Sequence, residues 1–191
     1  NVATYYEKTE CVRDNSTGLI WQGQTGPGTG LRGNDQFKSN FDSTSALQKW
    51  DGSNWVTPTT EDINAGTNSI GFKNAINSTN LCGGNDWRMP TLGELGCLVK
   101  GVNPAFDQEW FPNTAYIDVG GYWTSSPYVF PARAFVPFDI EFTDPKAFYV
   151  NFDYGFGYGY YRDQYFSANW LVRLVRGTSA STCQIPDHSQ G

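Results

Sequence analysis

Four cysteines restrict this chain more than any other feature, because each disulfide must hold two distant segments together in the fold. They stand at positions 11, 82, 97 and 183, with no CxxC pair and no metal-ligand spacing. The even number favours two disulfides and an oxidising compartment over buried free thiols. Among the three pairings, we favour Cys11 with Cys183 and Cys82 with Cys97.

The rest of the composition predicts one aromatic-rich domain over residues 1–191. Aromatic residues make up 16% of the chain, which also contains 21 glycines and 10 prolines. Rings rather than aliphatic side chains must therefore fill much of the core. So many glycines and prolines favour strands and shaped loops over helical bundles.

The charge balance excludes some classes of partner. The chain has 13 Lys and Arg against 19 Asp and Glu, a net charge of -6, so we expect no nucleic acid partner. No apolar run approaches the roughly 20 residues that cross a bilayer, so we expect no membrane insertion. Residues 1–20 lack a charged segment followed by an apolar one, so we expect a processed or trimmed start.

Local patterns predict mixed secondary structure in the first half of the chain. Strand-like residues around the turn DNSTG predict a hairpin over 4–22. The glycine-rich run 23–34 lacks the GK[ST] of a phosphate-binding loop and reads as a surface loop. We expect short helices over 43–50 and 70–81, separated by a long loop over 51–69.

The clearest helix signal follows Pro90. Thr91 and Glu94 match a capping box, in which each side chain bonds a free amide at the start of a helix. We expect that helix to end near Gly101.

Aromatic and β-branched residues predict a sheet in the second half. The strand-like segments are 121–126, 147–155 and 168–177. Alternation in the last segment predicts a strand with one face more strongly buried than the other. Glycines alternate with rings over 152–166, which suits either a flexible loop or an irregular hairpin.

Several of these pieces occur together in one order. They are DNSTGLIWQ (14–22), CGGNDWRMPTLGELGCLV (82–99), NPAFDQEWFPNT (103–114), GYWTSS (121–126), AFYVNFDYG (147–155) and LVRLVRG (171–177). The series resembles the family typified by the C-terminal domain of the Legionella collagen-like adhesin, over about 12–177. The resemblance implies an extracellular bacterial α+β module of surface proteins with a C-type-lectin-like architecture of antiparallel strands, two or three short helices and long loops. The best-known member binds sulfated glycans.

The chain departs from the family in ways that affect these implications. The family commonly has a cysteine where this sequence has Leu174, so its disulfide pairing cannot be copied. The insertion over about 23–69 and the acidic balance are also unusual, and a polar tail over 178–191 follows the matching region. Sulfated glycans need clusters of Lys or Arg, so the acidic balance favours neutral sugars or proteins as ligands.

One segment offers a candidate contact surface for a ligand or for another subunit. It combines rings, hydroxyls and one cation, as aromatic-rich binding surfaces do. Its residues are Tyr154, Phe156, Tyr158, Tyr160, Tyr161 and Arg162. The alternative is that these rings belong to a core hairpin.

Other conspicuous residues favour architecture over chemistry. Asp86, Trp87 and Arg88 precede the helix cap, and Trp123 lies in a predicted strand, so we interpret them as structural rather than ligand-facing. Ser125 and Ser126 have no histidine near them in the sequence. The single histidine, His188, lies in the polar tail and offers poor support for acid–base chemistry.

No metal or cofactor site is expected. The alternating acids Asp139, Glu141 and Asp144 do not match a calcium loop, and we interpret them as a solvated strand face.

These observations lead to two functional hypotheses. The first is a non-catalytic adhesion domain, outside the cell or on its surface, that binds a glycan or protein. The second is a self-assembling subunit of a pilus or other extracellular filament, and in either case we expect a homo-oligomer. An enzyme is the least favoured alternative.

Overall fold

Short strands and short helices follow one another along the chain, joined by long loops. The computed structural model describes residues 5–128, 145–163, 165, 170–179 and 183. The strands are β1 (Cys11–Arg13), β2 (Ile20–Gln22), β3 (Lys49–Trp50), β4 (Trp55–Val56), β5 (Gly121–Pro127), β6 (Lys146–Asn151), β7 (Phe156–Tyr161), β8 (Trp170–Leu171) and β9 (Val175–Arg176). The helices are α1 (Thr60–Asn64), α2 (Ser69–Ser78), the 3₁₀ turn η1 (Leu81–Gly83) and α3 (Leu92–Gly96). The predicted α+β class is confirmed.

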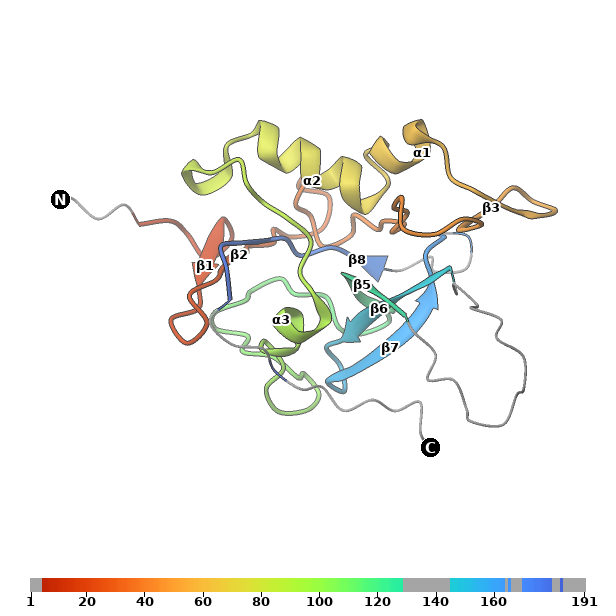
Figure 1. Ribbon diagram of the computed structural model, residues 1–191. Helices are drawn as coiled ribbons and strands as arrows, with labels where there is room; N and C mark the ends of the chain where they lie inside the picture. The colour runs from red at the N-terminus through yellow and green to blue at the C-terminus, as the bar shows by residue number, and fades with distance from the viewer. Residues whose placement is uncertain (1–4, 129–144, 164, 166–169, 180–182, 184–191) are drawn as a thin grey trace.

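The strands form three sheets (Figure 1). The largest has the order β7-β6-β5-β8, in which β8 runs parallel to β5 and the other pairs are antiparallel. The second has the antiparallel order β1-β2-β9, and β3 pairs with β4 in a separate hairpin. The hairpin predicted over 4–22 is therefore present as β1 and β2, with shorter strands. Pairing of β2 with β9 brings early and late parts of the chain side by side.

The segment 170–176 runs between two hydrophobic cores. Its first two residues belong to the largest sheet and its last two to the β1-β2-β9 sheet. Alternate side chains enter different cores: Trp170, Val172 and Leu174 pack in one cluster with Trp87 and Trp123, and Leu171 and Val175 pack in the other with Trp21 and Tyr122. Both faces are buried, so the prediction of one more strongly buried face is wrong. The alternation marks two cores rather than a core and solvent.

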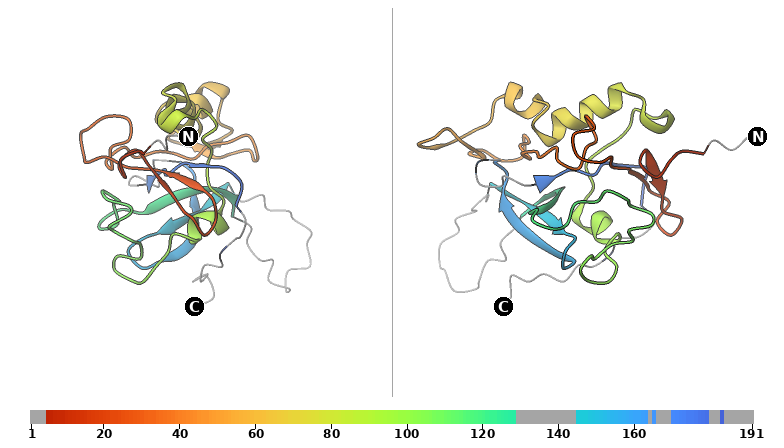
Figure 2. Two further views of the ribbon diagram at one scale, coloured as in Figure 1. Left: turned by 90° about the vertical axis from the view of Figure 1, so that its left-hand side faces the viewer. Right: turned by 180° about the vertical axis from the view of Figure 1, so that it is seen from behind.

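Helices lie at two levels around the sheets. Figures 1 and 2 show α1 and α2 in sequence above the sheets and α3 lower, where it packs against β5 and β6. The buried side of α2 contributes Phe72 and Ile76 to the core that contains Trp123. The helix predicted over 70–81 is thus present, with its end at Ser78.

The helix predicted over 43–50 does not form. The Asp42 carboxylate accepts hydrogen bonds from the backbone N–H (3.0 Å) and hydroxyl (2.6 Å) of Thr44. Such local bonds stabilise a turn in competition with a helix. A helix forms instead in the segment predicted as loop, where Thr59 and Asp62 make a complete capping box at the start of α1.

One buried amide joins separate parts of the long predicted insertion to one another. Asn68 is fully buried, and its Oδ1 accepts hydrogen bonds from the Phe41 N–H (2.7 Å) and the Ser39 hydroxyl (2.9 Å). Its Nδ2 donates to the carbonyls of Ile63 (2.7 Å) and Phe41 (3.0 Å). All four bonds would be lost together on its removal, so this side chain orders residues 39–68.

The disulfide pairing that we favoured from the sequence is wrong. Cys11 is bonded to Cys82 and Cys97 to Cys183, with Cα–Cα distances of 6.6 and 5.0 Å. The physical reason is that Cys11 and Cys82 both pack against the core that contains Trp87. Cys97 instead ends α3, whose Leu95 belongs to the other core. Most of the tail 178–191, including His188, lies outside the described residues, as do Asp139, Glu141 and Asp144.

Removal of one disulfide tests this pairing and its energetic weight. The Cys97→Ala, Cys183→Ala double variant opens a link over a sequence separation of 86. Loop-closure entropy predicts a loss of about 4.5 kcal/mol in the free energy of unfolding, measured by urea denaturation. The Cys11→Ala, Cys82→Ala variant opens the other disulfide, and we expect a similar loss in its free energy of unfolding. Peptide mapping without reduction checks the pairing, and a peptide that joins Cys82 to Cys97 would contradict it.

Candidate functional site

The candidate contact segment forms the second strand of a β-hairpin. Asn151 at the end of β6 accepts hydrogen bonds through Oδ1 from the N–H groups of Asp153 (2.8 Å) and Tyr154 (3.2 Å). This side-chain turn, followed by Gly155 at a φ of 79°, reverses the chain. β7 then pairs with β6 in regular antiparallel register, with Tyr158 opposite Tyr149. The structure thus contains a hairpin here, with regular rather than irregular strand pairing.

The two-residue period of a strand places three rings of β7 on one face. We call Phe156, Tyr158 and Tyr160 the aromatic surface. The glycines between them, at 157 and 159, point to the other face. Tyr149 of β6 stacks against Tyr158 with ring centroids 5.7 Å apart. The surface is therefore a row of rings on a paired strand rather than a flexible loop.

Buried tryptophans support the aromatic surface from below. Tyr160 stacks on Trp170 at 5.3 Å, and Trp170 stacks on Trp123 at 4.7 Å. Exposure rises along this column, from 0% at Trp123 through 7% at Trp170 to 39% at Tyr160. The outer ring is thus held in place by the core, which lowers the entropic cost of binding through it.

Tyr149, which lies beside the aromatic surface, has a perturbed hydroxyl. Burial, together with the neighbouring Tyr158 and Tyr160, raises the pKa of Tyr149 well above its ordinary value. Tyr149 therefore stays protonated at physiological pH, and its hydroxyl can both donate and accept.

Two of the other predicted contact residues lie apart from the aromatic surface. Tyr154 is exposed in the turn before β7, next to the surface but outside the strand. Tyr161 ends β7 on the opposite face, where it stacks on Trp55 at 5.0 Å and lies under the Lys146 ammonium at 4.7 Å. The structure thus brings together three of the five predicted rings.

Arg162 is not a surface residue, which corrects its placement in the predicted contact segment. Its side chain is 1% exposed, and its Nη1 lies 2.8 Å from Asp42 Oδ2 and 3.0 Å from the Asn40 carbonyl. A guanidinium so enclosed cannot reach a ligand on the face of β7. It links the end of β7 to residues 40–42 instead.

The DWR segment forms a corner between α2 and α3. Trp87 is 2% exposed, donates through Nε1 to the Leu81 carbonyl (3.1 Å) and lies under the Arg176 guanidinium. Asp86 pairs with Arg176 at 2.5 Å. The Arg88 backbone exchanges two 2.9 Å hydrogen bonds with Val175. These contacts fix the corner onto β9.

The start of α3 is capped differently from the prediction. The Thr91 hydroxyl accepts from the Glu94 N–H (3.2 Å), as expected for an N-cap. The Glu94 carboxylate, however, pairs with Arg88 at 2.9 Å and accepts from the Thr91 hydroxyl. The Pro90 carbonyl accepts from the Ser125 N–H (2.8 Å), which ties the cap to β5.

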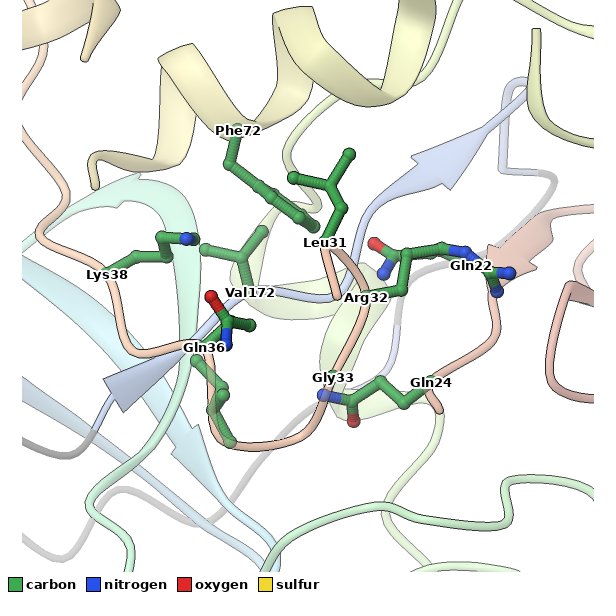
Figure 3. Close-up of a pocket in the computed structure, with 10 residues that line it drawn as sticks. Gln22, Gln24, Leu31, Arg32, Gly33, Gln36, Lys38, Phe72 and Val172 are labelled. Carbon is green, nitrogen blue, oxygen red and sulfur yellow. The ribbon is translucent and has the colours of Figure 1, made fainter. Parts of the chain in front are cut away.

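A small, partly open cavity lies between the loop after β2 and α2 (Figure 3). It has a volume of about 10 Å³, enough for about one water molecule. Lys38, which is 6% exposed, lies in its wall with the ammonium 5.3 Å from the centre of the Phe72 ring. Burial lowers the pKa of Lys38. The cavity is too small to bind a sugar or a peptide side chain.

The sequence did not single out Tyr149, Trp170 or Asp42 as parts of this region. The alternation in 146–151 is the signal that could have placed Tyr149 beside the rings of β7. Trp170 and Asp42 meet β7 only through the tertiary fold, so no local pattern indicates them. In the described part of the chain, no group of three or more His, Cys, Asp and Glu is arranged to hold a metal ion.

Comparison with known proteins identifies one family. A disulfide-linked α+β domain with an aromatic surface is the class that the fold defines. The chain belongs to the Lcl C-terminal domain family, which it matches over residues 10–176. The family is that of an adhesin-like surface domain. Neither a curated protein nor a solved structure matches the chain. Among the described residues, no helix has the length and apolar character needed to cross a membrane.

The Arg162 ion pair gives a pH-dependent prediction. Burial raises the pKa of Asp42, but Arg162 and hydrogen bonds from Thr44 and Gln48 together lower it more, so the net pKa lies below 3.8. A carboxyl with a depressed folded pKa stabilises the fold above its unfolded pKa, and this contribution is lost as pH falls through the folded value. We therefore expect Asp42→Asn to lose about 3 kcal/mol at pH 7, because Arg162 keeps its buried charge without a carboxylate.

The measurement is urea unfolding from pH 7 down to pH 2. The wild type should lose stability more steeply than Asp42→Asn below pH 4. Asp51→Asn, at an exposed turn carboxylate, serves as the control and should change little. Equal losses for the two variants at pH 7 would disprove the role of the ion pair.

Proposed function

We propose that this chain is a non-catalytic adhesion domain that binds a glycan or protein ligand through the aromatic surface. The observation that carries the proposal is the column of stacked rings from buried Trp123 through Trp170 to the exposed Tyr160. Rings held by the core present a rigid flat face with a hydroxyl edge. Such faces bind the C–H surface of a sugar ring or an apolar side chain at little entropic cost.

Charge favours neutral ligands at this surface. Its three rings carry no charge, and the chain has a net charge of -6. A sulfated glycan needs cations that face its anionic groups. Two basic side chains of the described residues near β7, Lys146 and Arg162, lie on the other face and in the interior respectively. We therefore propose an uncharged sugar or a protein.

The proposal that the domain is non-catalytic draws support from the two serines of β5. The Ser126 hydroxyl accepts a hydrogen bond from the Leu92 N–H (2.9 Å) at the first turn of α3. The Ser125 hydroxyl donates to the Pro90 carbonyl (3.2 Å). Both hydroxyls thus bind backbone groups at the cap of α3, which is a structural use.

We further propose an extracellular or cell-surface location and a C-type-lectin-like relationship for the fold. Family membership and the two disulfides support the location, because disulfides persist in oxidising compartments. The pairing of β2 with β9 supports the relationship, because it closes the intervening chain into one long loop.

A second candidate function is assembly into an extracellular filament. β7 lies at the edge of the largest sheet, and no strand of the described residues pairs with its outer side. Its sequence FGYGYY has no charge and no proline, the features that usually protect an edge strand. Pairing of β7 with another copy would bury the same rings that we assign to ligand binding.

Substitution of Tyr160 tests the adhesion proposal. We expect Tyr160→Ala to lose at least tenfold in ligand affinity, because it removes the exposed ring that stacks on Trp170. Tyr158→Ala should weaken binding as well. The measurement is binding of the non-reduced protein to an array of neutral and sulfated glycans and to host cells.

Trp110→Ala is the matched control, since Trp110 is an exposed ring outside the aromatic surface. Thermal unfolding of each variant checks that the fold persists. The proposal would be refuted if the wild type bound no glycan of the array and if Tyr160→Ala, Tyr158→Ala and Trp110→Ala all still bound host cells.

Light scattering with negative-stain imaging separates adhesion from assembly. If the filament hypothesis holds, the purified non-reduced protein forms filaments, and Tyr160→Lys abolishes them by placing a charge on the edge strand. The Trp110→Lys control should still assemble. A wild-type protein that stays monomeric or forms a small closed oligomer would exclude the filament.

A further inference from the structure

A polar groove of about 500 Å³ opens beside the Cys11–Cys82 disulfide. Three segments line it: the residues before β1, the loop after β2, and the end of α2 together with η1. Its volume falls within the range of small-molecule binding sites. The small cavity of Figure 3 lies next to it, and the two share Leu31 and Arg32. None of the groove residues belongs to β6 or β7, so the groove is separate from the aromatic surface.

The groove has an apolar base and a polar rim. Ile76 and Leu81 are buried beneath it and belong to the core. Thr79 caps the end of α2, and its hydroxyl donates to the Ile76 carbonyl (2.7 Å). Asn80 follows with a φ of 52°, in the left-handed region that asparagine tolerates. This reversal places Asn80 on the rim as an exposed residue.

Three polar groups of the groove retain unused hydrogen-bonding capacity. The Asn80 side-chain amide and the Tyr6 hydroxyl have no hydrogen-bond partner among the described residues. Glu10 uses Oε2 to accept from the Glu7 N–H (3.0 Å), and its Oε1 has no partner among the same residues. An amide, a carboxylate and a phenol offer both donors and acceptors.

The charges of the groove balance. Glu10 and Arg32 are its two charged residues in the described lining. Burial lowers the pKa of Arg32, and the neighbouring Glu10 opposes that shift. The Arg32 Nη1 donates to the backbone carbonyls of Thr9 and Gly23, so part of the guanidinium is already engaged. The groove therefore has no excess of positive charge that would attract an anionic ligand.

We propose that this groove is a second binding site, whose ligand is a neutral oligosaccharide. The Tyr6 ring, which is 42% exposed, supplies an aromatic face for one sugar ring. The Asn80 amide binds sugar hydroxyls both as a donor and as an acceptor, and the Glu10 carboxylate binds them as an acceptor. The site lies on elements different from those of the aromatic surface, so it goes beyond the function proposed above and does not depend on it.

The test uses the full chain with its disulfides intact. Cello-, chito- and maltohexaose serve as neutral probes and heparin as the sulfated one, each titrated by calorimetry. We expect at least one neutral hexaose to bind. Asn80→Gly keeps the left-handed backbone and removes the side-chain amide. Glu10→Gln keeps an oxygen that can accept the hydrogen bond from the Glu7 N–H and removes the negative charge. Each should weaken binding at least tenfold.

Variants of the two surfaces keep the two proposals distinguishable. Tyr160→Ala should leave hexaose binding in the groove unchanged, whereas Tyr6→Ala should abolish it. Unchanged thermal unfolding of Asn80→Gly and Glu10→Gln checks that the fold persists. Absence of binding to every neutral hexaose, binding to heparin alone, or hexaose binding that depends on Tyr160 but not on Asn80 would each overturn this inference. The last result would support the aromatic surface instead.

Discussion

A buried arginine joins the separate parts of this fold at one point. Arg173 is 1% exposed, and its guanidinium donates to the Gln22 carbonyl (2.8 Å), Gln24 Oε1 (2.9 Å) and the Thr114 hydroxyl (2.7 Å). The Tyr122 ring lies 5.6 Å from its centre. Burial lowers its pKa, and neutral oxygens rather than a carboxylate among the described residues compensate for the lost hydration. Loss of the guanidinium would remove three buried hydrogen bonds at once, and Gln24 Oε1 would keep only the one from the Tyr122 hydroxyl.

The position of Arg173 explains how a site at the edge of the largest sheet is ordered from the core. It fixes the segment 170–176 between the two cores, and Trp170 at the start of that segment stacks on Trp123 and Tyr160. Gly120 is required there, because a Cβ at this position would lie 2.3 Å from the Trp170 ring. The aromatic surface is thus the outer end of a column whose middle ring, Trp170, belongs to the segment that Arg173 fixes.

Local sequence signals predicted the parts of the fold that depend on neighbouring residues. The hairpin around DNSTG and the Thr91 cap both rest on short-range contacts, and both are present, whereas the alternation of glycines and rings in β7 left a loop and a hairpin open. The pairing of the cysteines and the burial of Arg162 depend on which core each segment enters. Asp42, the partner of Arg162, lies 120 residues away in the sequence. No window of the sequence contains that contact, and the groove around Asn80 likewise requires three separate segments.

The same burial of cations also decides which ligands suit the surface. Lys38, Arg162 and Arg173 are three of the 13 basic residues, and all three are buried. Arg162 pairs with the Asp42 carboxylate, Arg173 binds neutral oxygens, and the Lys38 ammonium lies over the Phe72 ring, so none of the three faces an anionic ligand. Of the acidic residues, Glu94 and Asp163 are buried among the described positions. The cations that stabilise the interior therefore do not offset the acidic side chains on the exterior of a chain whose net charge is -6.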